Sequence, residues 1–225
     1  AMTSTATTPV GLDARVAELA ERYRPLAVAI LKEVVRIPAD YVGKSKAEGG
    51  DPQSGLSNHE HARLSFLRDT IIDIEAVLAP TDVWFDEFGN LVWMVQDGSD
   101  GIAPDQKKVV YMDGHSDTVQ ALRGQWHEKL AGAVDPYDGL LDEARLPHDA
   151  LRKELGYVPP DGEWQHLVFG RGSADQLAGV VAEAIATKIL LELAPEGALR
   201  GAIVRAYATV AEEDNDGGGP RYIMS

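Results

Sequence analysis

The chain has 225 residues, enough to bury a substantial core, and we expect one large domain rather than two. Its 36 acidic and 21 basic residues give a formal net charge of −15, which argues against nucleic acid or an anionic membrane as a partner. Cysteine is absent, which excludes disulfides, thiolate metal ligands and a cysteine nucleophile. At the start of the chain, residues 1–8 have neither the basic nor the apolar region of a signal peptide, so we expect a cytoplasmic protein.

The first third of the chain is predicted to contain helices on either side of a loop. Residues 13–36 have apolar side chains at helical spacing, and Pro25 can divide this segment into two helices. Residues 39–57 are rich in glycine, serine, lysine and aspartate, and we interpret them as a mobile loop near the entrance to the site. The segment Ser57–Glu60 has the pattern of a capping box and is predicted to open a helix that runs to about Leu78.

The rest of the chain alternates strands with helices. Residues 82–95 are predicted to form two strands joined by a turn at Gly89-Asn90. The run Val109–Met112 is too apolar to alternate, as expected of a strand that is covered on both faces. The further elements predicted are an inserted surface helix within 141–162, a short strand at 167–169, a buried crossover helix at 176–194 and a strand at 202–210. This alternation predicts an α/β fold with a largely parallel central sheet flanked by helices.

Acidic residues and one histidine follow the apolar runs. His115 and Asp117 come directly after the run that ends at Met112, Asp175 follows the next, and the pair Glu212-Glu213 follows the last. Residues just past the carboxyl ends of different strands in an open α/β sheet meet in one crevice, so these side chains are expected to converge. One imidazole with several carboxylates is the ligand set of a hydrolytic zinc or manganese centre.

Each of these motifs also has a simpler interpretation. His115-x-Asp117 could be a satisfied polar pair at a strand end, and Asp175 could merely N-cap the following helix. The acidic run 212–216 could be a solvated loop. The Gly-x-Gly-x-x-Asp sequence that ends at Asp175 is similar to a dinucleotide fingerprint, but a carboxylate in place of its third glycine would repel a pyrophosphate. A nucleotide-binding protein therefore remains only a minor alternative.

Taken together, the motifs resemble the co-catalytic dinuclear zinc peptidase and deacylase family, which includes acetylornithine deacetylase, succinyl-diaminopimelate desuccinylase and the glutamate carboxypeptidases. An ordered set of short motifs is far more specific than any one of them. The resemblance is carried, in chain order, by Leu31–Pro38, Phe88–Leu91, Gly114–Val119, Asp135–Tyr137, Gly170–Asp175 and Glu212–Asp214.

The resemblance implies a zinc-peptidase-like catalytic domain with two divalent metal ions, zinc first, with manganese or cobalt as alternatives. It implies that His115 binds one metal ion, Asp175 bridges both and Glu213 binds the other. Asp117 would orient the imidazole, and Glu212 would be the general base that takes a proton from the attacking water. The implied reaction is hydrolysis of an amide bond in an N-acyl amino acid or a small peptide.

The resemblance also implies a cis peptide bond at Asp175-Gln176 and parts that this chain does not contain. In the family, each metal takes a further ligand from downstream sequence, and a dimerising lid domain lies between. We therefore interpret residues 1–225 as the N-terminal part of a metallopeptidase catalytic domain. The complete protein is expected to be a homodimer, whereas this chain alone is expected to be inactive. The alternative is a non-catalytic metal-binding or interaction module that retains the motifs.

Overall fold

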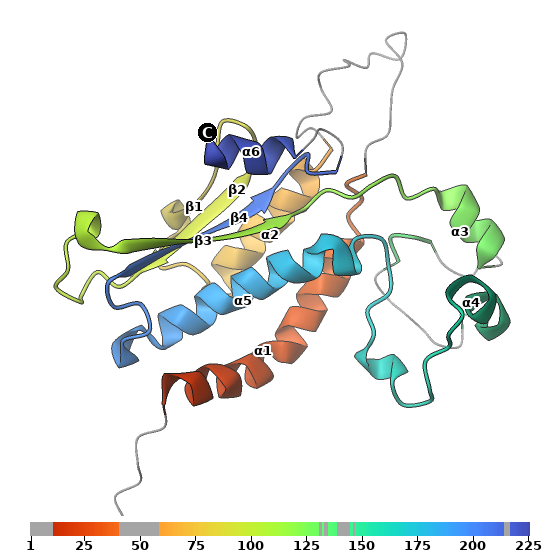
Figure 1. The fold of residues 1–225 in the computed structure, drawn as a ribbon, viewed down its shortest axis with the longest axis horizontal. Coiled ribbons are helices and arrows are strands. Elements are labelled where there is room, and N and C mark those ends of the chain that lie inside the picture. The colour runs from red at the N-terminus through yellow and green to blue at the C-terminus, as the bar shows by residue number, and fades with distance from the viewer. Residues whose placement is uncertain are drawn as a thin grey trace, which may run out of the picture.

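A computed structural model describes residues 11–40, 59–130, 132, 135–138, 145, 147–213 and 217–225. Its main elements in chain order are α1 (Leu12–Val35), α2 (His61–Asp73), β1 (Val83–Phe85), β2 (Leu91–Gln96), β3 (Lys108–His115), α3 (Arg123–Lys129), α4 (His148–Leu155), α5 (Ala178–Glu192), β4 (Ala202–Thr209) and α6 (Gly218–Met224). Helix α5 packs against strands β2, β3 and β4, and α1 packs against α5 (Figure 1). The expected α/β class, with a central sheet flanked by helices, is confirmed.

The sheet has the strand order β1-β2-β4-β3 and is mixed. Strands β3 and β4 are parallel, whereas β1 pairs with β2 and β2 pairs with β4 in antiparallel fashion. The expectation of a largely parallel sheet therefore holds only for the β3–β4 pair. That pair needs a long crossover, which α5 supplies. Its register places His115 opposite Thr209, so both strands end at the same edge of the sheet.

The hairpin predicted at residues 82–95 is present as β1 and β2, with Phe85 opposite Leu91. Its turn is organised by Asp86, whose Oδ1 accepts hydrogen bonds from the backbone N–H groups of Phe88, Gly89 and Asn90 at 3.0, 2.9 and 2.9 Å. Gly89 has a φ of 104°, a backbone conformation that residues with a side chain rarely adopt. The sequence Asp-x-x-Gly-Asn therefore forms the turn and leaves Asn90 at the base of β2.

The core lies between α5 and the sheet, as predicted for a buried helix at residues 176–194. Trp93 of β2 is 0% exposed and faces α5 together with Ala206 of β4. The indole Nε1 of Trp93 donates to Thr187 Oγ1 at 3.1 Å, and that hydroxyl donates to the carbonyl oxygen of Ala184 at 3.0 Å. Helix α5 is thus fixed to the sheet by both apolar contact and a directed hydrogen bond. Within the described part of the chain, no helix has the length and apolarity needed to span a membrane.

The prediction that Val109–Met112 is covered on both faces is wrong. Val109, Val110 and Tyr111 are 37%, 40% and 59% exposed. Among the described strands, β3 is the last in the sheet order and pairs only with β4, so one side of it has no neighbouring strand. An apolar run does not by itself distinguish an edge strand from a central one.

The short strand predicted at 167–169 is also absent. These residues pair with no described strand, and Phe169 instead packs edge-on against Trp126 of α3, with ring centroids 5.9 Å apart. This contact belongs to a second, smaller apolar cluster beside α3 and α4, away from the sheet (Figure 1). Helix α4 lies inside the predicted surface helix and ends, as expected, at Gly156, which is left-handed with a φ of 68°.

Both N-terminal helices differ from their predicted form. Helix α1 continues through Pro25 rather than dividing there, although its ribbon bends near its middle (Figure 1). Helix α2 ends at Asp73 rather than near Leu78, and Glu75 just after it has a φ of 58°. The predicted loop at 39–57 and Ser57 of the predicted capping box lie almost entirely outside the described residues.

Candidate metal centre

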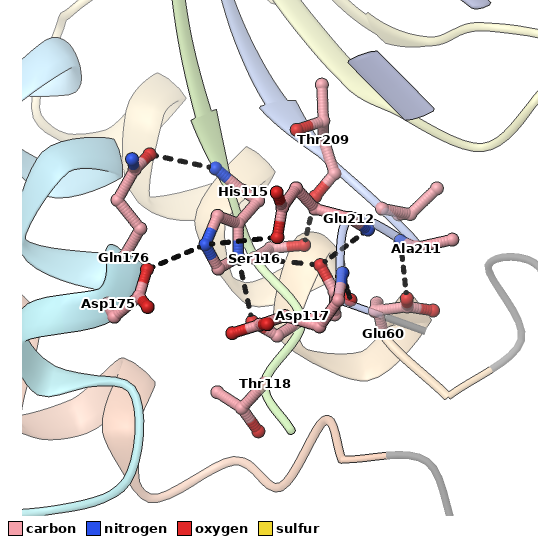
Figure 2. Close-up of polar contacts among 12 residues, drawn as sticks. Glu60, His115, Ser116, Asp117, Thr118, Asp175, Gln176, Thr209, Ala211 and Glu212 are labelled. Carbon is pink, nitrogen blue, oxygen red and sulfur yellow. Dashed lines mark hydrogen bonds and ion pairs between the residues drawn. The ribbon is translucent and has the colours of Figure 1, made fainter. Parts of the chain in front are cut away.

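His115 is the last residue of β3, and its side chain is 7% exposed. The backbone N–H of the next residue, Ser116, donates to the carbonyl oxygen of Thr209 at 2.8 Å, which holds the ends of β3 and β4 together. On the other side, the N–H of His115 donates to Gln176 Oε1 at 3.1 Å (Figure 2). The backbone that carries the imidazole is therefore held at the strand end by contacts to both β4 and Gln176, just before α5.

Both ring nitrogens of His115 face oxygen atoms (Figure 2). Nδ1 lies 3.0 Å from the backbone oxygen of Asp117 and 3.5 Å from its Oδ1. Nε2 lies 2.9 Å from Asp175 Oδ1 and 3.7 Å from Glu212 Oε2. Burial lowers the pKa of His115, but the carboxylates of Asp117 and Asp175 outweigh it and raise that pKa to about 9. The site therefore favours a positive charge at this imidazole.

Asp175 lies in the turn Ser173–Leu177, which precedes α5. The peptide bond between Asp175 and Gln176 is cis, as predicted. Helix α5 has Leu177 at its N-cap and no side-chain capping hydrogen bond, so Asp175 does not cap it. The side chain of Asp175 is 77% exposed and extends toward His115. Gly172 lets this turn lie close to the segment that follows β3, because a Cβ at residue 172 would lie only 2.7 Å from Thr118 Cγ2.

The segment Val210–Glu213, which carries both glutamates, is held through its backbone. Its four consecutive N–H groups each donate to a side-chain oxygen: Val210 to Asn90 Oδ1 at 3.0 Å, Ala211 to Glu60 Oε1 at 3.1 Å, Glu212 to Asp117 Oδ1 at 3.1 Å and Glu213 to Asp117 Oδ2 at 3.0 Å. The start of the acidic run is therefore a fixed strand end, not a freely solvated loop. Residues 214–216 lie outside the described part of the chain.

The structure brings the predicted site residues together, with two differences from the expected layout. One potential ligand atom from each of His115, Glu212 and Glu213 lies within 4.8 Å of the others, and Asp175 is not part of that group although it touches His115. The geometry thus includes the predicted base, Glu212, among the possible ligands. In addition, both carboxylate oxygens of Asp117 accept from the Glu212 and Glu213 amides, and its backbone oxygen is the nearer contact of the imidazole. The individual roles remain predictions.

The donor set suits a divalent cation. An imidazole nitrogen and carboxylate oxygens are ligands of zinc and manganese. Burial raises the pKa of Glu213, and the negative charges of Asp175, Glu212 and Asp117 raise it further, whereas His115 opposes them. Several carboxylates gathered in a small volume repel one another, and a cation between them would relieve that repulsion.

Three residues that support the site were not predicted as such. Glu60 was assigned to a capping box and Asn90 to a turn, yet both are fully buried and bind the Val210–Ala211 backbone. Arg63 of α2 is also 0% exposed and donates to the carbonyl oxygen of Ser116 at 2.6 Å. Burial lowers the pKa of Arg63 to about 10. The sequence did contain one sign of a supporting role for Arg63, because this charged residue lies on the apolar side of a predicted helix.

The fold and the site define an α/β domain with one histidine and several carboxylates at the carboxyl ends of two parallel strands. Among solved structures, the chain is similar to the dipeptidase Dug1p of Saccharomyces cerevisiae, with a TM-score of 0.54 and 14% identity over 89% of this chain and 35% of that one. It is also similar to human carnosine dipeptidase 1, with a TM-score of 0.52 and 18% identity over 93% of this chain and 36% of that one.

The chain thus spans about a third of the length of these two dipeptidases. At such low identities the likeness concerns the fold. No protein-family model matches the sequence, and no curated protein matches it either.

Proposed function

We propose that this chain carries part of the active site of a metal-dependent hydrolase that cleaves an amide bond in a small peptide or an N-acyl amino acid. The observation that carries the proposal is the convergence of Asp175 and Glu212 on Nε2 of His115, with Glu213 beside them. The fold likeness to two dipeptidases supports a peptide bond as the target.

Two divalent ions are proposed for this site, zinc first, with manganese and cobalt as alternatives. His115 and Glu213 would each hold one ion, and Asp175 would contribute to both. When bound, such ions polarise the amide carbonyl and lower the pKa of water. Because a ligating histidine must be neutral, the ion would have to displace the proton that the surrounding carboxylates favour on His115.

Glu212 is proposed as the general base. Its side chain is 41% exposed and its Oε2 lies 3.7 Å from His115 Nε2, so it can contact both the site and incoming water. It would take a proton from the attacking water and return it to the leaving amine. Asp117 would fix the backbone from which Glu212 and Glu213 project, and would hold the imidazole of His115 by its carbonyl oxygen.

The proposal includes ligands from polypeptide outside these 225 residues. If Asp175 is shared, each ion has only two protein ligands in this chain, whereas catalytic zinc usually has about three plus water. We therefore expect the chain alone to bind zinc weakly and to lack turnover, and a longer form of the protein to be the active one.

Zinc titration by calorimetry tests the site directly. The chelator-treated chain is compared with His115→Ala and with His166→Ala, a matched control at an exposed histidine. We expect the His115 variant to lose binding and the control to keep it. Zinc binding that does not depend on His115 would contradict the site. Dipeptides and N-acetylated amino acids are assayed in parallel with a longer form, and metal binding without turnover there would favour a non-catalytic metal-binding module.

A further inference from the structure

The backbone that presents the two glutamates is held by side chains from three separate parts of the chain. Asn90 immediately precedes β2, Glu60 immediately precedes α2, and Asp117 follows β3. Figure 2 shows the contacts of Glu60 and Asp117. We call these three residues, Asn90, Glu60 and Asp117, the amide clamp. Their side-chain oxygens together accept hydrogen bonds from the four backbone N–H groups of Val210–Glu213. Backbone N–H groups that are shielded from water need a hydrogen-bond partner, and here side chains supply all four.

We propose that Glu60 and Asn90 are positioning residues that set where the carboxylates of Glu212 and Glu213 lie relative to His115. This inference rests on the proposed function, because the two carboxylates are given a purpose only by the proposed metal site. The clamp itself is a property of the metal-free chain and can be tested without metal.

Glu60 acts at the point where the backbone turns toward the site. Ala211 has a φ of 52°, a left-handed conformation that is uncommon for a residue with a side chain. Such a conformation persists only where surrounding contacts hold it. The N–H of Ala211 donates to Glu60 Oε1 at 3.1 Å, and both residues are fully buried. This contact fixes the residue that immediately precedes Glu212.

Glu60 is also linked to the histidine side of the site through α2. Arg63, on the first turn of that helix, donates to the carbonyl oxygen of Ser116 at 2.6 Å and to that of Ile37 at 2.8 Å. A buried carboxylate is costly unless opposite charge and hydrogen bonds compensate it, and Arg63 supplies nearby positive charge. One end of α2 therefore contacts both the Ala211 and the Ser116 backbones, which keeps Glu212 and His115 at a set separation.

Asn90 holds the same segment from the other side. Its Oδ1 accepts from the N–H of Val210, and its Nδ2 donates to Asp86 Oδ2 at 2.9 Å and to the carbonyl oxygen of Gly219 at 3.4 Å. A Cβ on Gly219 would lie 2.2 Å from the carbonyl oxygen of Val210, so glycine is required for this approach. The amide uses both its acceptor and its donor, and an aspartate would lose the donor.

The test compares Glu60→Ala, Glu60→Gln and Asn90→Ala with a structural control, Leu199→Ala. Leu199 is fully buried in a separate apolar cluster with Val95 and Val204, so its truncation should lower stability without touching the clamp. The first readout is amide hydrogen exchange of residues 210–213 in the metal-free chain. The second is the dissociation constant for zinc, measured well below the unfolding temperature of every variant.

We expect Glu60→Ala to speed exchange at Ala211 and Glu212 at least about tenfold and to weaken zinc binding about 10–100-fold, as removal of supporting contacts to ligands usually does. Glu60→Gln keeps an acceptor oxygen and should remain close to the parent chain in both readouts. Asn90→Ala should speed exchange at Val210 and Ala211, which keeps the test informative if Glu60→Ala fails to fold. Leu199→Ala should lower the unfolding temperature and leave both readouts unchanged.

Three results would overturn the inference. Exchange at 210–213 that is unchanged in both Glu60→Ala and Asn90→Ala would show that the clamp does not hold the segment. Equal effects of Leu199→Ala and Glu60→Ala would reduce Glu60 to a general stability role. A loss of zinc affinity in Glu60→Gln as large as in Glu60→Ala would assign the effect to charge rather than position. If neither the parent chain nor a longer form of the protein bound zinc, the proposed function would fail, while the exchange measurement would still decide on the clamp.

Discussion

The proposed site gives two adjacent glutamates at one strand end different roles, with Glu213 as a metal ligand and Glu212 as the general base. We predict that Glu212→Gln retains zinc binding, because the change removes a proton acceptor but keeps the shape of the side chain. In a form of the protein that turns over substrate, it should lower kcat on the order of a hundredfold to ten-thousandfold. Glu213→Gln should instead weaken zinc binding, because it removes a proposed ligand.

Calorimetry on both variants separates the two roles. The 3.7 Å distance between Glu212 Oε2 and His115 Nε2 makes a ligand role for Glu212 sterically reasonable, so the comparison is informative. Equal loss of zinc affinity in the Glu212 and Glu213 variants would show that Glu212 is a ligand, and the base would then have to be sought elsewhere.

A third acidic residue, Glu183 of α5, predicts a pH dependence of stability. Burial raises the pKa of Glu183 to about 8, and the negative charge of Asp113 adds to the effect. A carboxyl group whose pKa is higher in the folded than in the unfolded state binds more protons when folded. The free energy of unfolding should therefore fall as pH rises from about 4.5 to about 8.

Chemical denaturation of the metal-free chain at a series of pH values measures this decline. Glu183→Gln, which cannot ionise, should remove most of it and should be more stable than the parent chain at pH values above 8. An unchanged slope in the variant would mean that another group titrates in this range.

At the residue scale, the sequence indicated the candidate site residues, whose roles stay predictions, but not the residues that support them. His115, Asp175 and Glu213 could be placed because each follows an apolar run or belongs to a known motif. Glu60 and Asn90 could not, because each also fits a local pattern, a capping box and a hairpin turn. Local hydrogen-bond patterns compete with tertiary ones, and only the fold shows that these two side chains reach a strand end far away in sequence.

At the scale of elements, the packing of α5 against the sheet includes one buried hydrogen bond, between Trp93 and Thr187. The indole N–H of Trp93 donates to Thr187 Oγ1 inside the core. We predict that Thr187→Val lowers the free energy of unfolding by about 1–3 kcal/mol, because it leaves a buried donor without a partner while nearly preserving volume. Thr187→Ser keeps the hydroxyl and should cost less. A fluorescence-monitored urea titration measures both, and equal losses would point to packing rather than the hydrogen bond.

Elements that are marked by turn residues or by a long apolar run were predicted correctly. Elements whose form depends on contacts with distant parts of the chain were not. The hairpin, α5 and β4 have clear turn residues or long apolar runs. In the run at 167–169, Phe169 packs on Trp126 instead of joining the sheet, and Leu167 is 37% exposed. Helix α6 begins with the sequence Gly218-Gly219-Pro220, which carries no helical periodicity and could not be found by pattern.

At the scale of the whole molecule, the sheet order leaves β3 at one edge of the described structure. The N–H groups of Lys108 and Ser116, at the two ends of β3, donate to backbone oxygens at the ends of β4. The backbone groups of the even-numbered residues of β3 therefore point toward β4. The odd-numbered residues Val109 and Tyr111 therefore direct their backbone groups outward. Together with Val110 they form an exposed apolar stretch, the kind of edge that pairs with other chains.

We therefore predict that the isolated 225-residue chain self-associates through this edge, although its net charge of −15 opposes association. Val110→Lys should reduce the association, because a charged side chain on an edge strand must be desolvated when another strand pairs with it. Since Val110 is already 40% exposed, the change should cost little stability. Val16→Lys, at a residue of α1 that is 39% exposed, is the matched control and should have no effect. Sedimentation velocity over a range of protein concentrations measures the outcome. A chain that stays monomeric throughout, or equal effects of the two lysine substitutions, would show that the β3 edge does not drive association.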